Sequence, residues 1–471
     1  MFYFSTRLET KEIQMACKSV ASRAVKTMLV ALTLPLLAAC DVEQRLSWSP
    51  DGNKLAVIGA DGVRVSTDGG LHLSEPVEPE AKLLNWFADS KRLLVVSETS
   101  YESWEAAEKR LSKEDVAAVG SCASQLITEL ERCNGDLAAC RDALKKNKFD
   151  ATHLNAALFY LNATQGEKIR KFAGNDGRLF RLGMTLSTVS TYDVDKDLKL
   201  KETLFTTDRT FDSAAVSPSN EYFCFISGAE NELLTAEAKN PKNTWKSFGR
   251  DYQDFPDWDI NTDFIYALKS VPAPGKGKPD FELVSIDVKK DPAQAVKHLS
   301  DVYSAYDKVR ATVDGNILFV ALRAGSVPVG KYSSLFSYNL TSGKLKKLQS
   351  SSSATQLEKF EVSPDGNSVS IPGAYNALAV LNLQNGKRQI VAPAVTKKDQ
   401  DTFVPVWRNN EELCFNRIQA GADKSTVSLY SLRTGQSKDL SNAWPEKAVA
   451  GLLAVTDKTL SFDDFLKSLR E

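Results

Sequence analysis

A recurring segment of fourteen residues constrains this chain more than any other feature. LSWSPDGNKLAVIG begins at Leu46, AAVSPSNEYFCFIS at Ala214 and FEVSPDGNSVSIPG at Phe360. Each copy contains a short alternating strand, a Ser-Pro turn and a second apolar strand. Proline presets φ at the second position of such a turn, and glycine or asparagine accepts the left-handed conformation later in it. The repeat therefore predicts β-hairpins.

Weaker copies and related hairpins extend this pattern along the chain. The weaker copies begin at Leu84, Pro256, Val309 and Val404, and hairpins with an X-Gly turn begin at Leu335, Leu378 and Val427. The seven repeat centres are Trp48, Trp86, Val216, Trp258, Thr312, Val362 and Trp407, with spacings of 38, 130, 42, 54, 50 and 45 residues. Apart from one outlier, this is the period of a four-stranded propeller blade, about 40–50 residues.

The repeat units resemble the TolB-type, WD40-like propeller repeat, most closely at Ser49-Pro50-Asp51-Gly52 and Ser363-Pro364-Asp365-Gly366. The expected fold class is all-β: a seven-bladed β-propeller over 45–456, with six and eight blades as the alternatives. We interpret the repeated tryptophans as core residues packed between blades. Nothing in the chain matches the additional α/β domain of TolB, so the function of TolB is not carried over.

The spacing of 130 residues predicts a small α-helical insertion over 101–178, in the second blade. Apolar residues recur there at helical spacing and predict three amphipathic helices that pack together. Cys133 and Cys140 fall on the apolar faces of the first two helices, which predicts a disulfide, with unpaired thiols as the alternative. Farther along, Ser461 and Asp464 form a capping pattern that predicts a C-terminal helix over 457–471.

The N-terminal region has the pattern of a secretory signal. An uncharged apolar run over 28–39 follows Lys18, Arg23 and Lys26 and ends in Leu37-Ala38-Ala39-Cys40. This ending resembles the lipobox of bacterial lipoproteins. The resemblance implies that 1–39 is a signal peptide, that Cys40 is lipidated and that 40–44 is a short tether.

Several features of this N-terminal interpretation have alternatives. Met15 and Met28 are alternative starts, and an ordinary secretory signal with a coincidental cysteine is the alternative to the lipobox. The expected location is the bacterial cell envelope, anchored by lipid and facing the periplasm. Asp41 favours the inner membrane by its resemblance to a retention signal, with the outer membrane as the alternative.

The charge balance limits the partners of this chain. Its 471 residues include 59 Lys and Arg against 60 Asp and Glu, a net charge of −1, and removal of 1–39 would leave −4. A nucleic-acid partner is not expected without a basic surplus, and an acidic body would depend on its lipid to stay on an anionic membrane. Three histidines make a His-based metal site improbable. We expect no cofactor, because no phosphate-binding or dinucleotide-binding motif is present.

The densest acidic and aromatic segment precedes the fourth unit and contains Tyr252, Asp254, Asp257, Trp258 and Asp259. We expect part of it to line one mouth of the ring as a ligand or partner surface, with an ordinary acidic loop as the alternative. No nucleophile motif is present, so we assign no catalytic residues and expect no enzyme. The predicted function is a protein-interaction or scaffold module with an unidentified envelope partner. The alternative is a propeller enzyme or small-ligand sensor that uses residues 252–259.

Overall fold

The computed structural model describes thirteen stretches of the chain. They are 45–133, 137–146, 153–173, 183–196, 198–227, 231–271, 280–290, 295–327, 332–350, 357–372, 377–392, 401–419 and 425–453. The expected signal peptide, Cys40 with its tether and the expected helix over 457–471 lie outside these stretches. Within them, no helix has both the length and the apolar character needed to cross a membrane.

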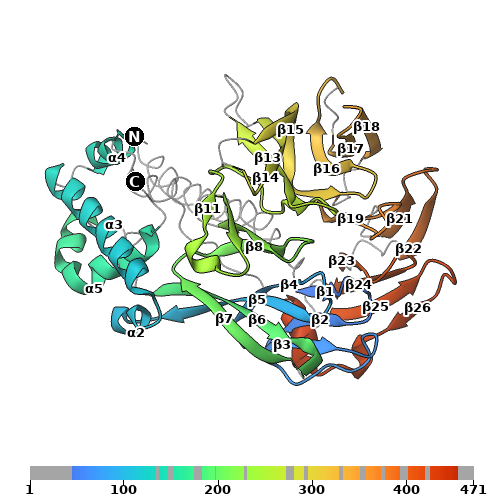
Figure 1. Ribbon diagram of the computed structural model, residues 1–471, viewed down its shortest axis with the longest axis horizontal. Helices are drawn as coiled ribbons and strands as arrows, with labels where there is room; N and C mark the ends of the chain where they lie inside the picture. Colours follow the sequence, from blue (N-terminus) through green and yellow to red (C-terminus); the bar gives the residue numbers. More distant parts are fainter. Residues whose placement is uncertain are drawn as a thin grey trace, which may run out of the picture. The chain divides into compact units, whose positions relative to one another are not determined.

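The strands of the described residues form six antiparallel sheets that follow one another along the chain (Figure 1). The first sheet contains β1 (Leu46–Trp48), β2 (Leu55–Gly59) and β3 (Gly62–Ser66). The second contains β4 (Ala81–Trp86), β5 (Arg92–Tyr101), β6 (Met184–Asp193) and β7 (Lys199–Thr207). The third contains β8 (Phe211–Val216), β9 (Tyr222–Ser227), β10 (Glu232–Glu237) and β11 (Lys246–Ser247).

The fourth sheet has seven strands and carries two of the repeat units. It contains β12 (Asp257–Trp258), β13 (Phe264–Val271), β14 (Asp280–Asp287), β15 (Val296–Ala311), β16 (Asn316–Arg323), β17 (Ser334–Asn339) and β18 (Leu345–Ser350). The long β15 pairs with β14 through its first half and with β16 through its second half. It therefore ends one unit and begins the next.

The last two sheets return to four strands. The fifth contains β19 (Glu361–Val362), β20 (Ser368–Pro372), β21 (Leu378–Asn382) and β22 (Arg388–Ala392), and the sixth contains β23 (Asp401–Trp407), β24 (Glu412–Gln419), β25 (Ser425–Ser431) and β26 (Ser437–Asp439). The first strands of the expected units are β1, β4, β8, β12, the second half of β15, β19 and β23. The number of blades stays a prediction.

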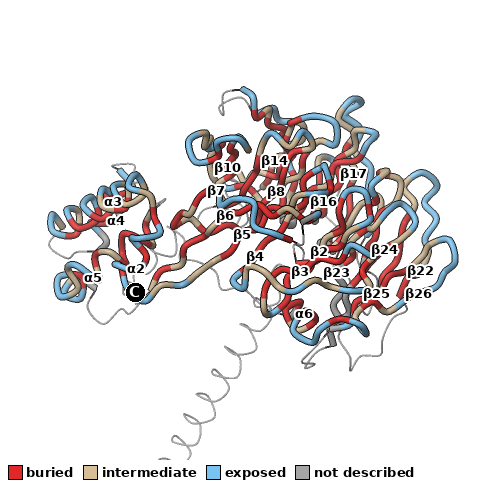
Figure 2. Tube along the Cα trace, turned by 60° about the horizontal axis from the view of Figure 1, so that its bottom comes forward, coloured by how far each residue is buried: buried red, intermediate tan, exposed pale blue. Residues whose placement is uncertain are grey.

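Apolar clusters join each sheet to the next. One cluster joins the first two sheets through residues such as Ile58 and Leu93, and similar clusters follow between the later pairs. The sixth sheet packs back against the first, because Cys414 and Val427 share a cluster with Leu55. The series of sheets is therefore closed on itself, and the buried strands of Figure 2 are its core.

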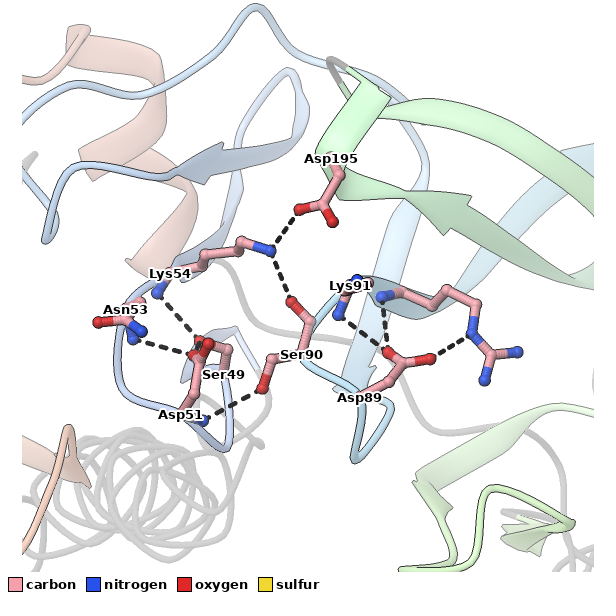
Figure 3. Close-up of polar contacts among 9 residues, drawn as sticks. Ser49, Asp51, Asn53, Lys54, Asp89, Ser90, Lys91 and Asp195 are labelled. Atoms are coloured by element: carbon pink, nitrogen blue, oxygen red, sulfur yellow. Dashed lines mark hydrogen bonds and ion pairs between the residues drawn. The ribbon is translucent and has the colours of Figure 1, made fainter.

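The turns between the first two strands of the units connect neighbouring sheets. Ser49 Oγ donates to Asp51 Oδ1 over 2.6 Å, and Asp51 N donates to Ser90 Oγ in the next turn over 3.1 Å (Figure 3). Lys54 Nζ crosses the same boundary to Ser90 O at 2.8 Å and to Asp195 at 2.5 Å. The Ser-Pro turn therefore fixes the neighbouring sheet as well as its own hairpin.

Similar contacts recur around the series. Ala88 N donates to Asn220 Oδ1 (2.7 Å), Ser219 Oγ to Asp263 Oδ1 (2.6 Å), Asp365 N to Asn410 Oδ1 (2.9 Å) and Arg408 Nε to Gly52 O (2.9 Å). The last of these joins the sixth sheet to the first. There the Arg408 guanidinium also lies 5.0 Å above the ring of Trp48.

The repeated tryptophans pack between sheets, as expected from the sequence. Trp86 Nε1 donates to Ser47 O over 3.0 Å, and Trp407 Nε1 donates to Glu361 O over 3.1 Å. Each acceptor belongs to the first strand of the preceding sheet. All four tryptophans at this position are buried. In the fifth unit the equivalent position is Ala311, one residue before the predicted centre at Thr312. The turn that follows is one residue shorter there: Thr312 N donates to Asn316 O, whereas Ser49 N donates to Lys54 O.

Four helices between β5 and β6 form a lobe at the end of the second sheet (Figures 1 and 2). They are α2 (Trp104–Glu108), α3 (Lys113–Arg132), α4 (Leu137–Lys146) and α5 (Leu154–Ala173). The short α2 was not expected from the sequence; Ser103 caps it and Trp104 anchors it. Helix α3 begins at a capping serine, Ser112, whose hydroxyl accepts from Asp115 N.

The helical lobe has its own apolar core. Leu126, Leu130, Leu144 and Leu158 lie in one cluster that contains no residue of any sheet. A second cluster, including Trp104, Phe159 and Leu186, joins the lobe to β6. Cys122, which the helical pattern places off the apolar face, is buried in the first cluster, because three packed helices cover more of α3 than one stripe.

Candidate functional site

In two units, the residue before the tryptophan position of the first strand binds the first strand of the next unit. Asn85 Oδ1 accepts from Val216 N over 3.1 Å, and Asp257 Oδ2 accepts from Ala311 N over 2.8 Å. The side chains on this row are Ser47, Asn85, Ala215, Asp257, Arg310, Glu361 and Val406. Three consecutive members of the row are charged, which concentrates ionisable groups on β12, β15 and β19.

These three residues and Lys308 form a charged cluster. Arg310 binds Glu361 in a bidentate pair, with Nε to Oε2 and Nη2 to Oε1 both at 2.9 Å. Lys308 is nearly inaccessible and its Nζ also pairs with Glu361 Oε1. Asp257 lies next to Arg310 through its bond to Ala311 N. We refer to Asp257, Lys308, Arg310 and Glu361 as the inner charged cluster.

The two acids of this cluster have opposite pKa shifts. Burial opposes ionisation of Glu361, but Arg310 and Lys308 outweigh it and lower the pKa of Glu361 to about 2. Burial raises the pKa of Asp257, and the Glu361 charge adds to this, while Arg310 and the Ala311 N–H oppose it. Glu361 is therefore held as an anion by its partners. Asp257 is the member of the inner charged cluster whose protonation is easier to change.

The structure separates the five residues that the sequence grouped. Tyr252 and Trp258 are buried in the cluster between the third and fourth sheets. Tyr252 OH donates to Phe248 O over 3.1 Å, and burial raises the pKa of its hydroxyl to about 12. Asp259 accepts from Asn261 N, Thr262 Oγ1 and Tyr266 OH, so it stabilises the turn after β12. Asp254 is partly exposed.

Of these five residues, Asp257 joins the inner charged cluster. Lys308, Arg310 and Glu361 come from later units and were not predicted from the sequence. A signal was available, since Lys308 and Arg310 are two residues apart and share a face of a strand. Arg310 also occupies the same repeat position as Asp257 and Glu361. Aligning the units residue by residue would have placed these charges side by side.

Cys133 and Cys140 both pack on the core of the helical lobe, and the structure holds both as free thiols. The expected disulfide is thus not formed in it. Burial raises the pKa of Cys140 to about 12, and the adjacent Cys133 adds to the shift. Cys140 is therefore a thiol rather than a thiolate at neutral pH.

Over the described stretches, no group of three or more His, Cys, Asp or Glu is arranged to hold a metal ion. The inner charged cluster contains two cations and two anions, so its charges balance. Such a cluster can orient the first strands of three units and can exchange one internal ion pair for a ligand with matching charge.

The sheets and their contacts define the class of the protein. It is an all-β protein of the β-propeller class with a helical insertion: antiparallel sheets follow one another, pack face to face and close on themselves. A scan against protein-family models found no match, and a search of curated proteins found none either.

Solved structures similar to this chain are TolB proteins and other propeller domains. TolB from Acinetobacter baumannii is 15% identical over 54% of this chain and 59% of its own length, with a TM-score of 0.38. The β-propeller domain of the Trilobed protease from Pyrococcus furiosus is 8% identical over 82% of this chain and 93% of that one, with a TM-score of 0.48. The propeller domain of Myceliophteria thermophila Cps50 (Swd1) is 12% identical over 84% and 95%, at 0.44. With TM-scores below 0.5, the propeller class rests on the sheet contacts above.

Proposed function

We propose that this protein is a lipid-anchored β-propeller that acts as a non-enzymatic protein-interaction scaffold in the bacterial cell envelope. The observation that carries the proposal is the helical lobe. It interrupts a blade that needs only four strands, has a core of its own, and stands on the β5–β6 hairpin, whose ten residue pairs run from Arg92–Asp193 to Tyr101–Met184. A separately packed lobe on such a support offers a partner surface that the blades do not need for their own folding.

The polar groups of the inner charged cluster support the same proposal. Glu361 is bound by both Lys308 and Arg310, and Asp257 accepts from Ala311 N. These groups stabilise contacts between units. The residues Leu37-Ala38-Ala39-Cys40 support the lipid anchor by their resemblance to a lipobox.

A crosslinked pull-down from membranes tests the scaffold. The matched variant replaces 102–183 with Asn-Gly, which leaves Tyr101 paired with Met184 across a two-residue hairpin turn. We expect protein partners with the wild-type chain and their loss with this variant, whose sheets are checked by circular dichroism. A Cys40→Ser variant separates membrane location from partner contact. Wild-type chain that returns no partner above background would overturn the scaffold.

A second candidate is a small-ligand sensor, now centred on Asp257 rather than on 252–259 as a whole. The surroundings of Asp257 favour it: the side chain is partly exposed, lies beside Arg310 and has a raised pKa. A ligand with a cationic group would favour the ionised form of Asp257. Thermal-shift screening of the wild type and of Asp257→Asn tests this candidate, and equal shifts for every ligand would contradict it.

A further inference from the structure

Positive charge is concentrated on the outer hairpins of the last three units. These hairpins, β17–β18, β21–β22 and β25–β26, contain seven cations. The cations are Lys344, Lys346, Lys347, Lys387, Arg388, Arg433 and Lys438. The same hairpins contain one acid, Asp439, whose carboxylate accepts from Ser441 N and Ser441 Oγ. This part of the protein is therefore basic, although the net charge of the whole chain is −1.

The equivalent hairpins of earlier units are balanced instead. Residues 184–207, which contain β6 and β7, include three lysines and four acids. Residues 232–247, which contain β10 and β11, include three lysines and two acids. The excess of positive charge therefore belongs to the last three units and is not a property of the repeat itself.

Most of these cations are available to a ligand. Six of the seven are exposed and, within the described stretches, have no ion-pair partner. The seventh, Arg433, pairs with Glu411 at 3.6 Å. The name basic edge is used below for the other six: Lys344, Lys346, Lys347, Lys387, Arg388 and Lys438.

Packing brings the three hairpins of the basic edge to one side of the closed series of sheets (Figure 1). Leu348 of β18 packs on a cluster that includes Leu381 of the fifth sheet. Gln389 of β22 donates to Tyr430 OH over 3.1 Å and to Leu432 O over 3.2 Å, both in the sixth sheet. Each outer strand therefore reaches the next unit, and the cations of β18, β22 and β26 follow one another.

An exposed apolar side chain lies among these cations. Ile390 is 52% exposed and shares a face of β22 with Arg388, because the two are two residues apart. Gln389 points the other way, to the sixth sheet, so this face is turned toward the fourth sheet and β18. An apolar side chain flanked by cations suits the headgroup region of a bilayer.

We propose that the basic edge binds the surface of a bilayer rich in anionic phospholipid. Its cations are mostly lysines, which are compact charges on flexible stems and can follow mobile phosphate groups. A lysine or arginine close to an anionic bilayer raises partitioning by about fivefold, so several together give substantial binding. This contact needs no acyl chain on Cys40, and it goes beyond the proposed anchor and scaffold.

The aromatic residues of the three hairpins favour lipid over a protein or a nucleic acid. Phe336, Tyr338 and Tyr430 are all buried. Protein interfaces usually depend on aromatic anchors at their centre, and single-stranded nucleic acids stack their bases on exposed rings. The basic edge offers charge without such anchors, which matches a surface of phosphate groups.

Co-sedimentation with vesicles tests the basic edge on the full chain carrying Cys40→Ser, so that no acyl chain can contribute. The vesicles contain phosphatidylethanolamine with phosphatidylglycerol, or phosphatidylcholine alone as the neutral control. We expect binding to the anionic vesicles at about 0.1 M salt and its loss at about 1 M, because the Debye length falls from about 10 Å to about 3 Å. No binding to neutral vesicles is expected.

Two variants remove charge from different hairpins of the basic edge. Lys346→Gln/Lys347→Gln/Arg388→Gln should weaken binding to anionic vesicles by at least about tenfold. Lys387→Gln/Lys438→Gln should weaken it by about fivefold or more. All five side chains are exposed, so the fold should be unchanged, which circular dichroism and thermal unfolding check.

The matched control is Lys199→Gln/Lys201→Gln/Lys239→Gln. It removes three exposed lysines from β7 and from the turn after β10, and should change binding by less than about threefold, because charges away from the contact are screened. Equal losses in the control and in the triple variant of the basic edge would overturn the proposal.

Two further results would also contradict lipid binding. One is parent protein that ignores anionic vesicles or binds neutral vesicles as well. The other is binding to soluble polyglutamate or to DNA without binding to anionic vesicles, which would assign the basic edge to another polyanion. The pull-down tests the scaffold separately, so either proposal can fail without the other.

Discussion

The closed series of sheets and the helical lobe are stabilised in different ways. Each sheet packs on two neighbours and shares polar contacts with them, such as Asp51 N to Ser90 Oγ and the Arg310–Glu361 pair. Among the described residues, the lobe has its own core, an apolar cluster shared with β5 and β6, the His153–Asp208 bond and a 3.7 Å ion pair between Glu114 and Lys242 at the exposed surface. A destabilising substitution in one sheet should therefore weaken the neighbouring sheets as well, whereas one in the lobe should weaken only the lobe. This difference suits a rigid support that carries a separable partner surface.

The largest effect is expected from truncating the two cores. Leu126→Ala in the lobe and Leu55→Ala in the first sheet each remove a fully buried side chain. Each should lower the free energy of unfolding of its region by about 3 kcal/mol. Hydrogen exchange should show Leu126→Ala opening α3 and α5 while β2 stays protected, and Leu55→Ala lowering protection across the sheets. If Leu126→Ala reduced protection of β2 as much as of α3, the two regions would not be independent.

The inner charged cluster should contribute more to the free energy of unfolding than an ion pair at the exposed surface does. Arg310→Met removes a bidentate partner from Glu361 and should lower the free energy of unfolding by about 2 kcal/mol, discounted because both side chains are about one-fifth exposed. The matched control is Arg433→Met, which breaks a 3.6 Å pair with Glu411 at the exposed surface and should cost less than about 0.5 kcal/mol. Urea unfolding measures both, and equal losses would remove any special role for the cluster.

Two glycines test how much the turns between sheets contribute to stability. Gly52 and Gly386 have similar positive φ values, +70° and +72°, but a Cβ on Gly52 would lie 2.5 Å from Arg408 O, whereas one on Gly386 meets nothing within 4 Å. Gly386→Ala should lower the free energy of unfolding by about 1 kcal/mol because of the left-handed backbone. Gly52→Ala should lower it by about 1 kcal/mol more, because its Cβ would press against Arg408 O. Thermal unfolding compares the two, and equal costs would mean that the turn tolerates movement of the sixth sheet.

The smallest effect is a pH dependence of the lobe attachment. Burial lowers the pKa of His153, but the bond to Asp208 and its charge outweigh burial and raise it, with Asp115 adding to the shift and Arg209 opposing it. A raised pKa means that the stabilisation is complete below the unfolded value of about 6.5 and is lost as pH rises through the folded value.

Amide hydrogen exchange at the N-terminal turn of α5 should therefore speed up as pH rises through that range. After correction for intrinsic exchange rates, the change should correspond to a loss of local stability of no more than about 1 kcal/mol. His153→Gln should abolish the pH dependence. A pH response that persists in His153→Gln would assign it to another group.

Local chemistry made much of the fold predictable. The Ser-Pro turns and the alternating strands are properties of neighbouring residues, so the hairpins and the β class follow from the sequence. The insertion was predictable too, because the helical spacing of Leu126 and Leu130 breaks the blade period. Helix α2 was missed, since five residues are too few for a periodic signal and its anchor, Trp104, packs on residues far along the chain.

The candidate site was less predictable, because proximity in sequence was a poor guide to proximity in space. Tyr252, Trp258 and Asp259 lie close together in the sequence but serve the core and a turn. Asp257 instead meets Lys308 and Arg310 of the next unit and, beyond them, Glu361 of the following sheet, which lie beside it only after the units have packed.

The sequence by itself determined the repeat unit, its turns, the expected helices and the residues that resemble a lipobox, because each is encoded within a few tens of residues. Only the tertiary structure decided that Asp257 belongs with Lys308, Arg310 and Glu361, and that Arg45 at one end of the described chain binds Gly451 near the other. These relations depend on how successive sheets pack, and the packing comes from side chains that no local pattern pairs in advance.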